Sequence, residues 1–149
     1  MHVLHELPVS FISRELPESR NIFLIPVTPK KAFLLVFCAA GLWNEIEQAG
    51  IPDIQGVWLA EWGMRFFQVI SLKQRCGGHA RQAAHIALGA REGGYLGRLV
   101  VVVDDDVDPS NLADVMWAIT TRCEPAGQID IVRNAWSSAL DPRIPPDAK

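Results

Sequence analysis

The sequence has few cysteines, and their spacing fits no familiar paired arrangement. Cys38, Cys76 and Cys123 are odd in number and widely separated. Neither a disulfide framework nor a zinc knuckle built from paired cysteines is compatible with this pattern. Because unpaired thiols are usual in a reducing compartment, we expect a cytoplasmic protein.

An excess of positive charge is also lacking. Fourteen basic and seventeen acidic side chains give a formal net charge of -3. The chain therefore has no broad basic face with which to bind a phosphodiester backbone. Nucleic acid is not expected as a partner.

Long hydrophobic runs are absent as well. The most apolar stretch, residues 32–43, is too short to cross a bilayer and begins too far into the chain for a secretory signal. We expect it to be a buried segment, and no membrane span is predicted.

Prolines divide the chain into two parts. Four of them fall between residues 8 and 29, which prevents a long helix there. We therefore expect residues 1–40 to form an irregular arm and the start of a linker helix, and residues 41–149 to form an α/β domain. With 49% apolar residues the chain has enough hydrophobic surface for one compact core.

The first half of the expected domain has the pattern of one helix followed by two strands. Apolar residues at helical spacing precede Gly50 and Pro52, which predicts a helix that ends near Ala49. Two stretches rich in β-branched and aromatic residues, 56–59 and 65–72, predict strands.

The second half alternates helices with strands. A glycine pair at 77–78 opens a helix with a stripe of alanines, and a second pair at 93–94 ends it. Residues 99–103 are apolar without alternation, which predicts a central parallel strand covered on both faces. A helix follows Asn111, and residues 129–132 predict a last short strand. Right-handed crossovers between these elements predict an α/β fold with a mainly parallel sheet and flanking helices.

Basic residues surround the turn that opens the first of these helices. Lys73, Arg75 and Arg81 flank Gly77-Gly78, and a helix start offers free N–H groups and partial positive charge. This chemistry suits a phosphate group. The motif is not specific, because many solvated turns carry similar residues and the Walker and dinucleotide glycine spacings are both absent.

Other polar clusters have simpler interpretations. The carboxylates of residues 104–108 follow a strand and could bind a hard cation, but a turn and cap role before Pro109 is favoured. His79 and His85 are six residues apart, which does not place them on one helix face as metal ligands. The residues themselves identify no catalytic acid, base or nucleophile.

Five tryptophans are a high aromatic content for a small domain, which suggests contact surfaces. We expect Trp43 and Trp117 to pack in the core, because each falls on the apolar face of its predicted helix. Trp58, Trp62 and Trp136 are the candidates for an interface.

Four segments together resemble the C-terminal third of the UbiD family of decarboxylases, over about residues 42–146. They are AGIPDIQGVWL (49–59), VISLKQRCGGHARQA (69–83), VVVVDDDVDPSNLADVMWAITTRCEP (100–125) and WSSALDPRIPP (136–146). The resemblance implies an enzyme class that adds or removes carboxylate on aromatic or α,β-unsaturated acids. It also implies prenylated FMN as cofactor, with a divalent metal such as manganese and with potassium.

In that family the metal ligands, a catalytic Arg and two Glu residues belong to an upstream flavin domain, and this chain has no matching stretch. The resemblance places Arg81, usually Lys in the family, near the flavin phosphate, with Lys73 as the second cofactor-binding candidate. No catalytic and no metal residue is assigned.

Three functions remain open at this point. The first is a C-terminal domain or subunit of a prenylated-FMN-dependent decarboxylase, inactive alone, that assembles as a homo-oligomer or with a complementary flavin-domain chain. The second is a non-catalytic oligomerisation or interaction module of the same family. The third is an unrelated small protein that binds a nucleotide phosphate at the same turn.

Overall fold

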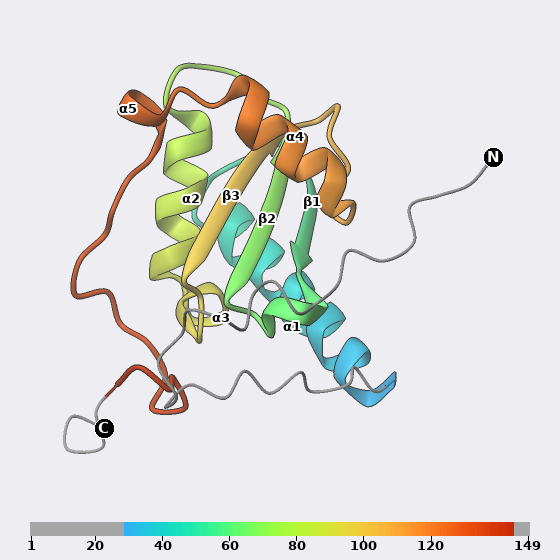
Figure 1. The fold of residues 1–149 in the computed structure, drawn as a ribbon, viewed down its shortest axis with the longest axis vertical. Helices are drawn as coiled ribbons and strands as arrows, with labels where there is room; N and C mark the ends of the chain where they lie inside the picture. Colours follow the sequence, from blue (N-terminus) through green and yellow to red (C-terminus); the bar gives the residue numbers. More distant parts are fainter. Residues whose placement is uncertain (1–28, 145–149) are drawn as a thin grey trace, which may run out of the picture.

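A three-stranded sheet with helices on both faces forms the centre of the molecule (Figure 1). A computed structural model describes residues 29–144. The arm expected before residue 29 and the prolines at 145–146 lie outside these residues. The elements are α1 (Pro29–Gln48), β1 (Ile54–Leu59), the short 3-10 helix η2 (Glu61–Gly63), β2 (Phe67–Leu72), α2 (His79–Gly89), α3 (Arg91–Gly94), β3 (Leu99–Asp104), α4 (Leu112–Arg122) and α5 (Pro125–Gln128).

Helix α1 packs on one face of the sheet along a stripe of apolar residues. Leu35, Cys38, Leu42 and Ile46 are buried at helical spacing. The helix ends before Gly50, which has a φ of 90°, a backbone conformation that glycine adopts at helix ends without steric cost. The predicted end near Ala49 is confirmed. Residue 40 lies inside this continuous helix. Within the described residues, no helix has the length and apolar content needed to cross a membrane.

The sheet is mixed, which corrects the prediction that it would be mainly parallel. Strand β1 pairs with β2 in the antiparallel direction, and β2 pairs with β3 in the parallel direction. The reason is the connection between β1 and β2. It is only a few residues long, and Met64 and Arg65 turn it back with positive φ angles of 46° and 76°. A parallel pair needs a crossover such as α2 and α3 provide between β2 and β3.

Strand β3 lies at the edge of the sheet, so the prediction of a central strand was wrong, although the predicted parallel pairing is confirmed. The strand order is β1-β2-β3, and the buried central strand is β2. Leu99 at the start of β3 is 59% exposed. The expected strand at residues 129–132 does not form, and Ile131 is 80% exposed. The valines of β3 contact helices on both sides, and this explains their continuous apolar pattern without a fourth strand.

Two apolar clusters stabilise the layers on either side of the sheet. Alternate residues of β2 point to opposite faces: Ile70 belongs to the cluster with α1 and α2, and Val69 to the cluster with α4. On α4 the buried residues are Val115 and Ala118. The sheet is therefore covered on both faces, with α1 and α2 on one and α4 on the other.

The division of the tryptophans into core and exposed residues differs from the prediction. Trp43 packs against the α1 cluster as expected, but Trp117 is 52% exposed beneath the Arg122 guanidinium. It points away from the sheet because the buried face of α4 carries residues 115 and 118. Trp58, an expected interface residue, packs instead against the α4 cluster. Trp62 and Trp136 are exposed.

The single helix predicted between the two glycine pairs is broken at Ala90, which is extended. Helix α3 then turns back against the end of α2. At Gly93 an added Cβ would lie 1.9 Å from the Ala87 carbonyl oxygen and 2.9 Å from Leu42 Cδ1. Glycine is required there because the backbones of α2 and α3 approach so closely.

This close approach predicts the effect of two glycine substitutions. Gly93→Ala should destabilise the fold by about 1–3 kcal/mol, because the backbone must shift to admit the methyl group. The matched control is Gly89→Ala, at the end of α2, where an added Cβ meets nothing within 4 Å. That change should be neutral or stabilising by up to about 1 kcal/mol. Urea unfolding would measure both, and equal stabilities would contradict the packing of α3.

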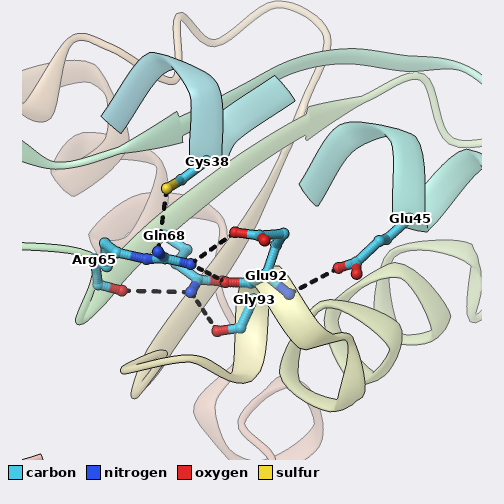
Figure 2. Close-up of polar contacts among 6 residues, drawn as sticks. All are labelled: Cys38, Glu45, Arg65, Gln68, Glu92 and Gly93. Atoms are coloured by element: carbon cyan, nitrogen blue, oxygen red, sulfur yellow. Dashed lines mark hydrogen bonds and ion pairs between the residues drawn. The ribbon is translucent and has the colours of Figure 1, made fainter. Parts of the chain in front are cut away.

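A polar cluster ties α1, β2 and α3 together (Figure 2). The Arg65 guanidinium donates to Cys38 Sγ at 3.1 Å, to the Glu92 carbonyl at 2.5 Å and to Glu92 Oε2 at 3.1 Å. Glu45 on α1 accepts the Glu92 backbone N–H at 2.9 Å. Gln68, buried at the start of β2, donates to the Gly93 carbonyl at 2.6 Å.

The cluster combines a neutral thiol, that of Cys38, with the charged pair of Arg65 and Glu92. Burial raises the pKa of the Cys38 thiol, although the nearby Arg65 charge opposes the shift. The thiol is therefore a neutral neighbour of the guanidinium. Arg65, only 13% exposed at its side chain, finds its counter-charge in Glu92 and also lies 4.8 Å from the centre of the Tyr95 ring.

Removing the guanidinium should destabilise the fold. Arg65→Ala is expected to cost about 1–3 kcal/mol, since it leaves the partly buried Glu92 carbonyl without its donor. Arg91 is the control, because it is exposed on α3 and has no side-chain hydrogen bond or ion pair among those of the described residues. Arg91→Ala should change the free energy of unfolding by under about 0.5 kcal/mol. A thermal or urea denaturation series in which both variants match the parent would exclude a structural role for the cluster.

Candidate functional site

The turn between β2 and α2 forms an open hollow of about 540 Å³. Its lining includes Gly77, Gly78, His79, Arg81 and His85. The turn follows the carboxyl end of β2, the buried central strand, so its position is set by the most firmly held part of the sheet. Gly78 has a φ of 84°, a left-handed conformation that favours glycine.

Two backbone donors are free at this helix start: the His79 N–H donates to the Cys76 carbonyl at 3.3 Å, but the N–H groups of Ala80 and Arg81 have no partner among the described residues. Gly78 occupies the N-cap position, and no side chain caps the end of α2 among the described residues. The first N–H groups of a helix have no partners within the helix. These donors and the positive end of the helix dipole form an environment that favours an anion.

The three basic residues predicted around the turn have different positions. Arg81 lines the hollow. Arg75 is turned away and makes two hydrogen bonds to the Asp53 carboxylate, one of them at 2.8 Å. These bonds lower the pKa of Asp53. Lys73 is exposed just beyond β2, and it is not among the residues that line the hollow. Of the two cofactor-binding candidates, the geometry gives Arg81 direct access to the hollow.

His79 is a buried polar residue in the wall of this hollow. It is 4% exposed, and its Nδ1 accepts the Arg75 backbone N–H at 3.2 Å. An accepting Nδ1 places the imidazole proton on Nε2. That Nε2 is buried and has no partner within the described part of the chain. The two histidines of this helix differ, since His79 is buried and His85 is exposed, and the spacing of residues in the sequence does not reveal the unpartnered Nε2 of His79.

The bond between His79 and Arg75 should hold the turn in shape. His79→Ala is expected to destabilise the chain by about 1–3 kcal/mol, because it leaves the Arg75 N–H without an acceptor and empties a buried volume. Gln82 provides the control on the same helix, since it is exposed and its side chain forms no hydrogen bond with the described residues. Gln82→Ala should change stability by under about 0.5 kcal/mol. Chemical denaturation of the two variants checks this difference, and a His79 variant as stable as the parent would contradict it.

The acidic residues after β3 act in a turn, as expected. Asp108 accepts hydrogen bonds from the Ser110 backbone N–H at 2.8 Å and from its hydroxyl at 2.7 Å, and these bonds lower the pKa of Asp108. Asp106 is bidentate with Arg122 at 2.7 and 2.6 Å. The helix cap itself is Asn111, which accepts the Ala113 N–H at 3.0 Å. Within residues 29–144, no three His, Cys, Asp or Glu side chains gather as metal ligands.

Comparison with known proteins identifies the family. Residues 33–149 match the model of the 3-octaprenyl-4-hydroxybenzoate carboxy-lyase C-terminal domain, UbiD_C. The chain belongs to the UbiD family. Within it, the chain is 33% identical over 131 residues to the phenolic acid decarboxylase of Sedimentibacter hydroxybenzoicus, covering 87% of this chain and 27% of that protein. It is 38% identical over 100 residues to the phenolic acid decarboxylase of Escherichia coli O157:H7, covering 66% and 21%.

Solved UbiD structures share the fold. The S. hydroxybenzoicus vanillic acid decarboxylase in its open form has a TM-score of 0.73 at 31% identity, over 83% of this chain and 26% of that one. The UbiD-class enzyme HmfF of Pelotomaculum thermopropionicum, in complex with FMN, has a TM-score of 0.70 at 28% identity, over 80% and 26%. The UbiD chain spans about a quarter of the length of these relatives.

Proposed function

We propose that this UbiD chain is the C-terminal domain or subunit of a prenylated-FMN-dependent decarboxylase or carboxylase that acts on aromatic or α,β-unsaturated carboxylic acids. The observation that carries the proposal is the match of residues 33–149 to the C-terminal domain of carboxy-lyases. Relatives named as phenolic acid decarboxylases support the reaction class. The chain is proposed to be inactive alone, because its described residues contain no catalytic acid, base or nucleophile in a recognisable arrangement.

The hollow before α2 fits the phosphate end of such a cofactor. Arg81 provides charge, the uncapped helix start provides N–H donors and Gly78 permits close approach. A structure of HmfF in complex with prFMN shows that a relative binds this cofactor. Bound prenylated FMN would accept the electrons released as carbon dioxide leaves. This chain would hold its phosphate through Arg81, with Lys73 as a more distant cation.

The described residues form no comparable site for a divalent metal such as manganese, or for potassium. The described residues offer no cluster of metal ligands, and Asp106 and Asp108 are already engaged by Arg122 and Ser110. We therefore assign both ions to a flavin domain outside this chain. The catalytic Arg and Glu residues implied by the family belong to the same place.

Exposed apolar residues suggest where such a partner makes contact. Leu34 and Val36 are exposed on α1, and Ile131, Trp136 and Leu140 are exposed along the C-terminal segment. Apolar surface of this kind marks interaction sites. We propose that it is covered by a complementary flavin-domain chain or by further copies in a homo-oligomer.

The chemistry can be tested on the purified chain. Supplied with prenylated FMN and manganese, it should release no carbon dioxide from aromatic or acrylic acids, and gas detection or substrate loss would measure this. Turnover by the chain alone would contradict its assignment as an incomplete enzyme.

A complementation experiment separates an enzyme domain from an interaction module. The chain would be mixed with the S. hydroxybenzoicus phenolic acid decarboxylase lacking its own matching C-terminal region. Recovered decarboxylation is the expected result. A stable complex without turnover would favour the non-catalytic oligomerisation module, and no complex would count against both.

A further inference from the structure

Arg81, the cation at the hollow, is already occupied by carbonyl and carboxylate oxygens from a distant part of the chain. Its Nε forms an ion pair with Asp130 Oδ2 at 2.8 Å, and its Nη2 donates to the Gly127 carbonyl at 2.5 Å. The same Asp130 oxygen lies 3.2 Å from His85 Nε2. Figure 1 shows α5, which contains Gly127, beside the start of α2. Segment 127–130 therefore lies against the rim of the hollow.

These contacts use the part of Arg81 that a phosphate would use. Nε and Nη2 form one edge of the guanidinium fork, and a phosphate binds such an edge through two oxygens. Here the two oxygens come from Asp130 and Gly127. A carboxylate at this position also offsets the charge of Arg81.

Other polar groups beside the hollow are left unused by segment 127–130. His79 lines it, and the buried Nε2 of this residue has no partner in the described chain. The start of α2 likewise has no side-chain cap. An anion in the hollow would therefore find the N–H donors of the helix start in addition to Arg81, whereas the Asp130 carboxylate contacts Arg81 and His85 among the described side chains.

The segment that carries Asp130 has little packing to hold it in place. Helix α5 is a single turn, and the expected strand after it does not form. Ile129 is 58% exposed on one side of Asp130 and Ile131 is 80% exposed on the other. An exposed ion pair of this kind contributes only about 0–1 kcal/mol, which a tighter anion would overcome.

We infer that Asp130 is an internal competitor for the phosphate-binding edge of Arg81 and so sets the affinity of the hollow for phosphate. The inference rests on the proposed function, since it concerns the same site. Phosphate binds by displacing Asp130 from Arg81.

The test is a titration of inorganic phosphate into the full chain, followed by NMR through the backbone amides of Gly77 and Gly78. Asp130→Asn keeps an oxygen that can accept from Arg81 but removes the charge. It should tighten phosphate binding about two- to fivefold, as expected from the loss of one exposed ion pair. Asp130→Ala, which removes both interactions, should bind at least as tightly as Asp130→Asn.

Two further variants show whether the effect passes through Arg81. Glu61→Gln makes the same charge change in η2, at the opposite end of β2 from the turn, because Leu59 pairs with Gln68. It should leave the affinity unchanged. In an Arg81→Ala background, Asp130→Asn should leave the phosphate affinity unchanged, because the guanidinium for which Asp130 competes is absent.

The outcomes distinguish this inference from the proposed function. Tighter binding in Asp130→Asn that vanishes in the Arg81→Ala background supports the inference. Binding that depends on Arg81 but is unchanged or weakened in Asp130→Asn overturns the inference and leaves the proposed phosphate site standing. Phosphate binding that does not depend on Arg81 overturns both.

Discussion

The Arg65 guanidinium connects three elements that are far apart in the sequence, and the position of the candidate site depends on them. A charge that is largely removed from water must keep its partners, and those partners are Cys38 on α1 and Glu92 on α3. Because only the extended Ala90 separates α3 from α2, fixing Glu92 also fixes the end of α2. The other end of that helix then has a defined position beyond β2, where the glycine turn and Arg81 form the hollow.

Local patterns predicted the elements well but not their arrangement. The end of α1 and the stripe of buried alanines on α2 follow from helical periodicity and glycine. The order of the strands cannot be predicted in this way, because an apolar run indicates that a strand is buried but not which strand lies beside it. Residues 129–132 have a β-branched pattern, yet a strand forms only with a hydrogen-bonding neighbour, and none is present among the described residues.

The site shows the same division. Glycines and nearby cations indicated an anion-binding turn, and the structure places Arg81 at its hollow. Sequence reasoning could not find that Arg75 is engaged by Asp53 or that Arg81 is engaged by Asp130, because these pairs join residues 22 and 49 positions apart, respectively. A basic residue that has no acidic neighbour in the sequence can therefore still be ion-paired in the fold. The resemblance to UbiD proteins points to Arg81 independently of its neighbours, and a role for Arg81 in binding the cofactor stays a prediction.

We propose that this UbiD domain contributes one part of a cofactor site, and that the residues that perform the chemistry belong to a flavin domain outside this chain. The central claim is that Arg81 holds the cofactor phosphate, and FMN retention measures this most directly. In a complex reconstituted with a UbiD flavin domain, Arg81→Ala should weaken FMN binding about ten- to a hundredfold, the equivalent of about 1.5–3 kcal/mol for a charge-assisted hydrogen bond. Arg91→Ala, on α3 beyond the far end of α2, should leave the FMN affinity unchanged. Equal FMN affinities for the Arg81→Ala and parent complexes would contradict the claim.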